Sequence, residues 1–176
     1  MKKLLLILTL SFLSIFCFAQ SKFEISKVDS ISKTKSELYS ATKMFISEYW
    51  KSAQNVIQND DKESGLILIK GTTKQIVGKG ISVRTFWYEY TVKFMIKDNK
   101  YKIVIDNIQY RSGPSADYDI KQLPFSVNLK DDNYPGVWKA GLYEKDWNDL
   151  MNQVKVEMSS IADNYNKYLQ SSKNDF

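Results

Sequence analysis

The segment TFWYEYTVKFMIKDNKYKIVIDNIQY, at residues 85–110, constrains the fold of this chain more than any other feature. It contains two runs in which apolar and aromatic residues alternate with polar ones, and Asp98-Asn99 separates the runs. Such a dipeptide between two alternating runs is typical of a two-residue β-hairpin turn. The pattern therefore predicts two antiparallel strands, at 83–97 and 100–110, joined by this turn.

The turn also fixes which side chains share a face, because successive residues of a strand point to opposite faces of a sheet. Placing Lys97 opposite Lys100 gathers the most apolar positions on one face, which we call the core face. Its members are Tyr90, Val92, Phe94, Ile96, Tyr101, Ile103, Ile105 and Asn107. The other face, called the second face, pairs Trp87 with Tyr110, Glu89 with Ile108, Thr91 with Asp106, Lys93 with Val104, and Met95 with Lys102.

The rest of the sequence predicts two helices and further strands. Thr34 and Glu37 form a capping-box pattern at the start of a helix that ends near Lys51, and apolar residues recur every three or four positions over 144–170. Strands are expected at 23–28, 52–58 and 66–73, the last buried on both sides, with a turn at 59–65. This order predicts the α+β class: an antiparallel sheet with both helices packed on one face.

The start of the chain, MKKLLLILTLSFLSIFCFAQ, has the pattern of a signal peptide rather than of a folded element. Lys2 and Lys3 precede an apolar run, so we expect removal of residues 1–19 and export to the periplasm or beyond, with the mature chain beginning at Gln20. A lipoprotein acylated at Cys17 is the alternative, which the bulky Phe16 disfavours. No transmembrane segment is expected after signal removal.

The mature chain, 20–176, is long enough for one domain and too short for two. We divide it into a core at 23–110, a segment at 111–143 and a C-terminal helix at 144–170. Segment 111–143 has little periodicity and holds all three prolines, but it keeps several large apolar residues. We therefore expect it to wrap over the domain.

Composition excludes several classes of function. The net charge of +5 falls to +3 when Lys2 and Lys3 leave with the signal peptide, which is a weak field for a dedicated nucleic-acid-binding protein. The chain has no histidine, which excludes Ser-His-Asp and Cys-His catalysis and zinc sites that contain histidine. The single cysteine, Cys17, leaves with the signal peptide, so the mature domain depends on its core alone. No cofactor is expected.

Two stretches carry a resemblance to a known family: ELYSATKMFISEYWKSAQNVIQNDDKESGLILIKGT, from residue 37, and YEYTVKFMIKDNKYKIVIDNIQY, from residue 88. Over residues 35–111 the chain resembles the secreted bacterial domain-of-unknown-function family 4468, whose members are described as having a fold like that of the TATA-box-binding protein (TBP-like). The resemblance implies a strand-helix-strands-helix layout and assigns no catalytic residue to this chain. It does not imply DNA binding, because a fold does not fix a function.

One short motif has a catalytic interpretation. Ser40 and Lys43, in SATK, match the Ser-x-x-Lys pattern of enzymes in which a lysine activates a serine nucleophile. Residues three apart share a helix face, but SKTK at 32–35 matches the pattern as well. A solvated helix face is therefore the simpler interpretation.

Acidic residues gather in three predicted loops. Paired carboxylates of this kind bind calcium or act as acid and base in glycoside hydrolysis. None of the groups has the spacing of a calcium loop, and acids beside Asn and Gly usually form turns, so no metal site is predicted. The residues concerned are Asp60, Asp61 and Glu63, then Asp117 and Asp119, then Asp131 and Asp132.

The apolar residues of the second face form a candidate interaction face. They either pack beneath segment 111–143 or receive a partner. Lysines spread along the strands from Lys70 to Lys102 favour an envelope protein or an anionic polymer as that partner, rather than nucleic acid. The members of the candidate interaction face are Trp87, Met95, Val104, Ile108 and Tyr110.

The sequence thus favours a non-catalytic binding or interaction module of the cell envelope. One alternative is a small hydrolase built from the Ser/Lys pair or from paired carboxylates. Another is a carrier that holds an apolar ligand between the sheet and the helices.

Overall fold

The predicted hairpin forms the centre of the structure, a computed structural model that describes residues 24–51, 53–77, 84–113, 127–128 and 143–171. β4 (Arg84–Lys97) and β5 (Lys100–Gly113) are antiparallel, and Lys97 lies opposite Lys100 as predicted. Asn99 in the turn has a left-handed backbone conformation (φ 58°), which asparagine adopts more readily than most residues. The turn residues therefore suit the turn they form.

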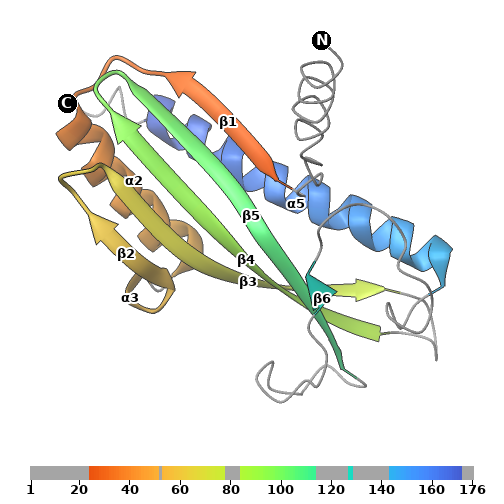
Figure 1. The fold of residues 1–176 in the computed structure, drawn as a ribbon. Helices are drawn as coiled ribbons and strands as arrows, with labels where there is room; N and C mark the ends of the chain where they lie inside the picture. Colours follow the sequence, from red (N-terminus) through yellow and green to blue (C-terminus); the bar gives the residue numbers. More distant parts are fainter. Residues whose placement is uncertain (1–23, 52, 78–83, 114–126, 129–142, 172–176) are drawn as a thin grey trace, which may run out of the picture.

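One antiparallel sheet surrounds this hairpin, with the strand order β1-β5-β4-β3-β2 and with β6 also paired to β5 (Figure 1). The additional strands are β1 (Ile25–Ser30), β2 (Ile57–Asp61), β3 (Leu66–Val77) and β6 (Val127–Asn128). β1 lies beside residues 100–105 of β5, and β6 lies beside 109–110. β4 pairs with one edge of β5, so β1 and β6 both pair with the opposite edge, one after the other along the strand.

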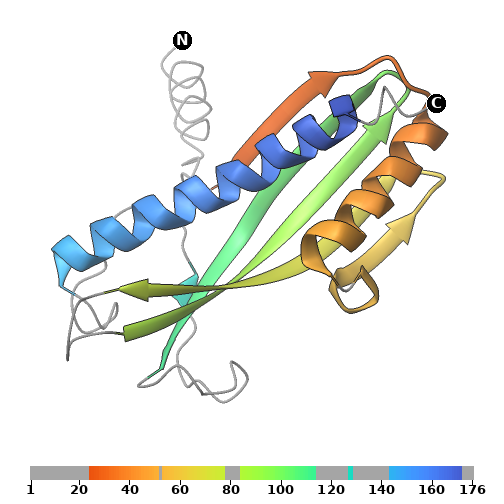
Figure 2. The same cartoon turned by 180° about the vertical axis from the view of Figure 1, so that it is seen from behind.

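Two long helices, α2 (Lys35–Trp50) and α5 (Glu144–Ser171), cover the core face, as Figures 1 and 2 show from opposite sides. α2 begins with the predicted capping box: the Thr34 hydroxyl accepts the N–H of Glu37, and the Glu37 carboxylate accepts the N–H of Thr34. The carboxylate of Asp98, in the hairpin turn, accepts the N–H of Lys35 at 2.7 Å. The predicted α+β class, with both helices on one face, is confirmed.

The hydrophobic core lies between the helices and the core face. Tyr165 of α5 stands at its centre, with its ring centroid 4.9 Å from those of Phe94 and Tyr101 and 5.1 Å from that of Phe45. Its hydroxyl shares a 2.7 Å hydrogen bond with that of Thr42, so the polar end of this buried ring is satisfied. The buried core-face residues of the hairpin include Phe86, Tyr88, Tyr90, Val92, Phe94, Ile96, Tyr101, Ile103 and Ile105.

Polar contacts attach β1 to α5. Lys27 Nζ lies 3.0 Å from Asp163 Oδ1. Asn166 Nδ2 donates to the Asp29 carboxylate and, at 2.6 Å, to the hydroxyl of Tyr101. The first strand of the described fold is therefore fixed by its last helix.

The strands before the hairpin differ from the prediction in two places. Residues 53–56 form the short helix α3 (Ala53–Val56) instead of a strand, and β2 runs into the predicted turn as far as Asp61. β3 is not buried on both sides: Ile67 and Ile69 are fully buried, whereas Lys70 is exposed and Leu68 is half-buried. The physical reason is that α2 and α5 cover only one face of the sheet.

Some predicted segments lie outside the described residues. These are the signal peptide at 1–19 and all of segment 111–143 except 111–113, 127–128 and 143. Among the helices that the structure describes, none is long and apolar enough to cross a membrane.

Candidate interaction face

A β-bulge at Asn107 changes which residues of β5 belong to the second face. Between the pair Thr91–Asp106 and the turn, the register is the predicted one. Beyond that pair β5 contains one extra residue, so that Trp87 lies opposite Arg111 rather than Tyr110. Asn107 has a left-handed backbone (φ 52°), the conformation found at the first residue of one common bulge type.

The bulge moves Ile108 from the second face to the core. Ile108 is fully buried within the core cluster, so its predicted place on the second face was wrong, and Asn107 is exposed instead of buried. Tyr110 pairs with Tyr88, and the Tyr110 side chain lies outside the described residues. The clue in the sequence was Asn107 itself, a polar residue at a predicted core position.

The other three predicted members stay on the second face. Trp87 and Met95 are half-buried on β4, and Val104 of β5 is only 6% exposed. Trp87 and Phe94 therefore lie on opposite faces of the sheet, as predicted. Neither α2 nor α5 covers the second face, since both pack on the core face (Figures 1 and 2).

Two of the lysines on the second face, Lys70 and Lys74, belong to β3. Lys74 Nζ lies 5.6 Å from the centre of the Trp87 ring, which is a cation–π geometry. Lys93 pairs at 2.7 Å with the buried carboxylate of Asp106, so its charge is compensated. Lys70 and Lys74 are exposed, and no carboxylate of the described residues forms an ion pair with either.

The indole nitrogen of Trp87 is a buried donor. It is shielded from solvent, and no acceptor among the described residues bonds it. A buried N–H without a partner costs about 1–3 kcal/mol.

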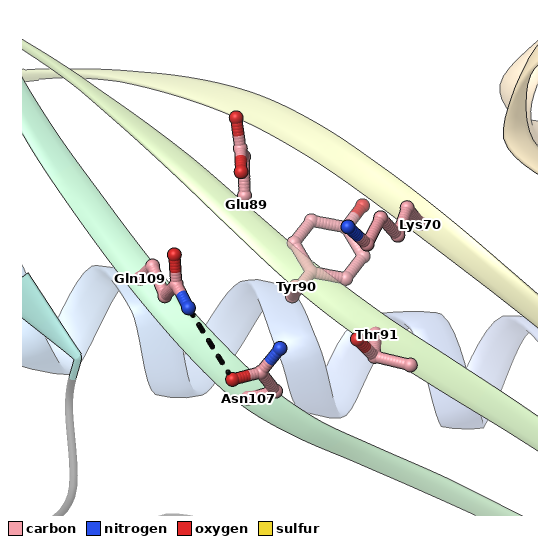
Figure 3. A pocket seen from close by; sticks show the side chains of 6 residues that line it. All are labelled: Lys70, Glu89, Tyr90, Thr91, Asn107 and Gln109. Carbon is pink, nitrogen blue, oxygen red and sulfur yellow. Dashed lines mark hydrogen bonds between the residues drawn. The ribbon is translucent and has the colours of Figure 1, made fainter. Parts of the chain in front are cut away.

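A small cavity of about 30 Å³ adjoins the bulge (Figure 3). The Gln109 side chain donates to that of Asn107 at 3.4 Å across its wall. A cavity needs about 10–15 Å³ of this kind of space to hold one water molecule, so about 30 Å³ is too small for an organic ligand. The residues that line it are Lys70, Glu89, Tyr90, Thr91, Asn107 and Gln109.

The Ser-x-x-Lys pattern does not form a nucleophile with a free base. Lys43 Nζ lies 2.6 Å from Asp60 Oδ2, and Tyr39 donates its hydroxyl to the same carboxylate. The Lys43 ammonium, and then the Tyr39 hydroxyl, hold the pKa of Asp60 below its ordinary value. An ammonium engaged by a carboxylate is not the free amine that a serine nucleophile requires. Ser40 itself is exposed on α2.

The carboxylates of Asp60 and Asp61 have roles in the fold. Asp61 Oδ1 accepts the N–H of Ser64 at 3.0 Å, which closes the turn between β2 and β3 and lowers the pKa of Asp61. The carbonyl of Glu63 accepts the ammonium of Lys35. Within the described ranges, no group of three His, Cys, Asp or Glu side chains is arranged to hold a metal ion. The remaining predicted loop acids lie outside the described residues: Asp117, Asp119, Asp131 and Asp132.

A shallow groove of about 440 Å³ lies between α2 and α5 on the helical surface. The Phe45 ring packs there against Tyr49 and Tyr168, at centroid distances of 5.3 and 5.5 Å. The groove is open to solvent and is not enclosed between the sheet and the helices, so the apolar-ligand carrier stays a prediction. Its other lining residues are Glu48, Asn164, Lys167 and Ser171.

Comparison with solved structures gives the fold class. The chain is similar to the crystal structure of a TBP-like protein from Parabacteroides distasonis ATCC 8503, with a TM-score of 0.61 and 16% identity over 87% of this chain and 96% of that one. It is also similar to a DUF4468 family protein from Bacteroides ovatus ATCC 8483, with a TM-score of 0.61 and 14% identity over 84% and 87%. At such low identity the likeness shows the fold alone. The protein has an α+β, TBP-like fold.

The family follows from the sequence match. Residues 25–111 match the model of the family described as "Domain of unknown function (DUF4468) with TBP-like fold". The match spans about half of the chain and runs from the start of β1 into the last residues of β5. The predicted resemblance is therefore confirmed, and this chain carries a DUF4468 domain. A comparison with curated proteins finds no match.

Proposed function

We propose that the protein is an exported, non-catalytic binding module of the cell envelope whose second face binds an anionic polymer. The feature that carries the proposal is Trp87 on the face opposite the helices, with Lys74 over its ring. An aromatic ring offers a flat surface for stacking, and an ammonium attracts carboxylate or phosphate groups.

The surroundings of Trp87 support this proposal. Lys70 and Lys74 are four residues apart on β3, so their side chains lie on the same face of the sheet and their ammonium groups follow the strand. Met95 extends the half-buried apolar surface along β4. These groups follow the strands rather than converge on one cavity, which suits an elongated ligand.

Export is proposed from the sequence. The apolar run after Lys2 and Lys3 supports a signal peptide at 1–19, and Phe16 disfavours acylation of Cys17. Fractionation of cells that express the full chain, followed by N-terminal sequencing, tests this. We expect a mature chain that begins at Gln20 in the periplasm or medium. A cytoplasmic chain that retains Met1 would contradict export.

Binding is tested with residues 20–176 and polygalacturonate, a polymer of carboxylated sugars, by calorimetry. The affinity should fall between about 50 and about 300 mM salt, because ions screen exposed charges. Trp87→Ala and Lys74→Gln should each weaken binding about fivefold, or roughly 1 kcal/mol, through loss of stacking and of charge.

Lys145→Gln is the matched control, since Lys145 is exposed on α5, which packs on the core face and not on the second face. This variant should bind polygalacturonate like the unmodified protein, and uncharged dextran should not bind. Absence of binding at low salt would refute the proposal. An effect of Lys145→Gln as large as that of Lys74→Gln would place binding elsewhere.

A further inference from the structure

The outer edge of β3 is paired along only part of its length. β2 pairs with residues 66–69, whereas β4 pairs with β3 from Leu66 to Val77. On the side away from β4, no strand in the described part of the chain pairs with residues 70–77. Figure 1 shows β3 continuing well past β2. The backbone groups of alternate residues in this stretch point toward an added strand.

This edge lacks several features that normally block strand addition. Segment 70–77 contains no proline, and its register with β4 continues without a bulge. Natural proteins use prolines, bulges, very short strands or charged side chains to protect an edge. Of these devices the segment has only charge, at Lys70 and Lys74. A regular edge of this length accommodates an extended peptide.

The two lysines determine which strand can be added. A second copy of this chain would bring the lysines of both edges together, and like charges opposite one another destabilise a strand pair. Acidic side chains on the second-face side of an added strand would instead pair with Lys70 and Lys74. On the core side, Gln75 donates to the carboxylate of Glu157 in α5, so that side disfavours acidic residues.

The core side of the edge favours small apolar residues. Tyr90 lies against the backbone of Gly71, with ring atoms within 2.6 Å of where a Cβ would stand. Thr73, the next residue on the same face, is half-buried. A matching peptide therefore alternates acidic residues on one face with apolar residues on the other.

We propose that the outer edge of β3, at residues 70–77, binds an extended acidic peptide by strand addition. Backbone hydrogen bonds hold the peptide, and Lys70 and Lys74 select its acidic face. The partner is a polypeptide segment held at the edge of the sheet. It is a different partner from the polymer proposed to lie across Trp87; the two proposals share Lys70 and Lys74, but this inference rests on the unpaired edge and does not depend on the other proposal.

Amide hydrogen exchange measured by NMR on residues 20–176 tests the proposal directly. In the free protein, amides of alternate residues within 70–77 should exchange fast, while the intervening amides, bonded to β4, should be protected. The peptide acetyl-Glu-Val-Glu-Val-Glu-Val-Glu-Val-amide should protect the fast set. The peptide in which lysine replaces every glutamate should leave it unprotected.

Two N-methylated forms of the acidic peptide provide a sharper control. One carries a methyl group on every glutamate nitrogen and the other on every valine nitrogen. Residues of a single parity direct their N–H groups toward β3, because residues two apart in a strand have the same orientation. One form should therefore lose binding and the other should retain it. Equal behaviour of the two forms would refute strand addition.

Lys70 and Lys74 belong to both proposed sites, so Trp87→Ala is the variant that separates this edge from the polymer site. Lys70→Glu combined with Lys74→Glu should weaken binding of the acidic peptide about tenfold and create binding of the lysine peptide. Trp87→Ala should change peptide affinity by less than about twofold, with folding confirmed by circular dichroism. Three results would overturn the proposal: protection of every amide of 70–77 in the free protein, equal affinity for both peptides, or a dimer that itself protects this edge.

Discussion

The core face and the second face of the sheet come from the same strands, yet different parts of the molecule constrain them. On the core face, Phe94 and Ile103 are fully buried beneath two helices, with α5 placing Tyr165 against Phe94. On the second face, Trp87 and Met95 are only half-buried, although the residues on both sides of each along β4 are buried. The helices account for the burial of Phe94 and Ile103, whereas Val104 on the second face is nearly buried although neither α2 nor α5 covers it.

This difference indicates which residues of a strand contribute to the stability of the fold and which are available for binding. A side chain enclosed on all sides contributes through packing, and its loss leaves a cavity. A half-buried aromatic ring beside an ammonium that forms no ion pair within the described residues still has exposed surface and charge with which to bind a ligand. The predictions below test the contrast, beginning with the largest expected effect.

Phe94→Ala should lower the free energy of unfolding by about 3–5 kcal/mol, because the buried ring packs against Phe45 and Tyr165. Met95→Ala, one residue further along and on the second face, should cost only about 1 kcal/mol. Urea unfolding followed by circular dichroism measures both. Equal losses for the two variants would mean that the faces are packed alike, and the comparison would fail.

Gly71→Ala should cost about 1–3 kcal/mol through overpacking. A Cβ at residue 71 would stand 2.4 Å from Cε2 of Tyr90, which is fixed in turn by a 3.3 Å hydrogen bond from Trp50 Nε1 to its hydroxyl. In a Tyr90→Leu background the same change should cost much less, because the obstructing ring atoms are gone. Thermal unfolding of the four proteins of this double-mutant cycle gives the coupling. Additive losses would contradict the contact.

Asn107→Ala should cost about 1 kcal/mol, because alanine tolerates a positive φ less well than asparagine does. Asn107→Gly should be neutral within about 0.5 kcal/mol, since glycine adopts this conformation freely. The side chain is exposed, so lost packing does not obscure the comparison. Guanidinium unfolding measures both variants. A glycine variant as unstable as the alanine variant would mean that the bulge does not depend on the left-handed backbone.

Lys43→Met should lower the free energy of unfolding at pH 7 by about 0.5 kcal/mol, the usual contribution of a partly exposed ion pair. The folded-state pKa of Asp60 lies below its ordinary 3.8, chiefly because of Lys43. This stabilisation is therefore present above pH 3.8 and is lost as the pH falls through the depressed folded-state pKa. Unfolding measured from pH 7 to pH 2.5 should show the two proteins converging. Asp60→Asn removes the titrating group. In that background the effect of Lys43→Met on the free energy of unfolding should not change with pH over the same range.

The sequence predicted the elements that have strong local patterns. The alternation on either side of Asp98-Asn99 fixed the hairpin and its first seven pairs, and the Thr34–Glu37 capping box fixed the start of α2. The periodicity over 144–170 located α5 to within one residue of its end at Ser171. These signals succeed because each is repeated over many residues or depends on a specific hydrogen bond.

The failures have a common physical origin, which is that one residue or one turn carries the signal. A single extra residue at Asn107 reverses every assignment beyond it, which removed Ile108 from the candidate interaction face. α3 spans only 53–56, too short for a periodic pattern to appear. The double-sided burial predicted for β3 failed because sequence does not reveal which face the helices leave open. Trp87 and Met95 were placed correctly because they belong to β4, which contains no extra residue. Val104 was placed correctly because it lies between the turn and the bulge in β5.

The attachment of β1 to α5 has a consequence for how the chain is made. Lys27 and Asp29 find their partners at Asp163 and Asn166, and the central ring of the interior belongs to Tyr165. A polypeptide that leaves a ribosome or a translocation channel N-terminus first cannot close its interior until these late residues have emerged. For most of its synthesis the apolar side of the growing hairpin is therefore wetted by solvent or held by a chaperone. We expect a chain cut short before Tyr165 to fold poorly and to be degraded readily, because it lacks the central ring of the core.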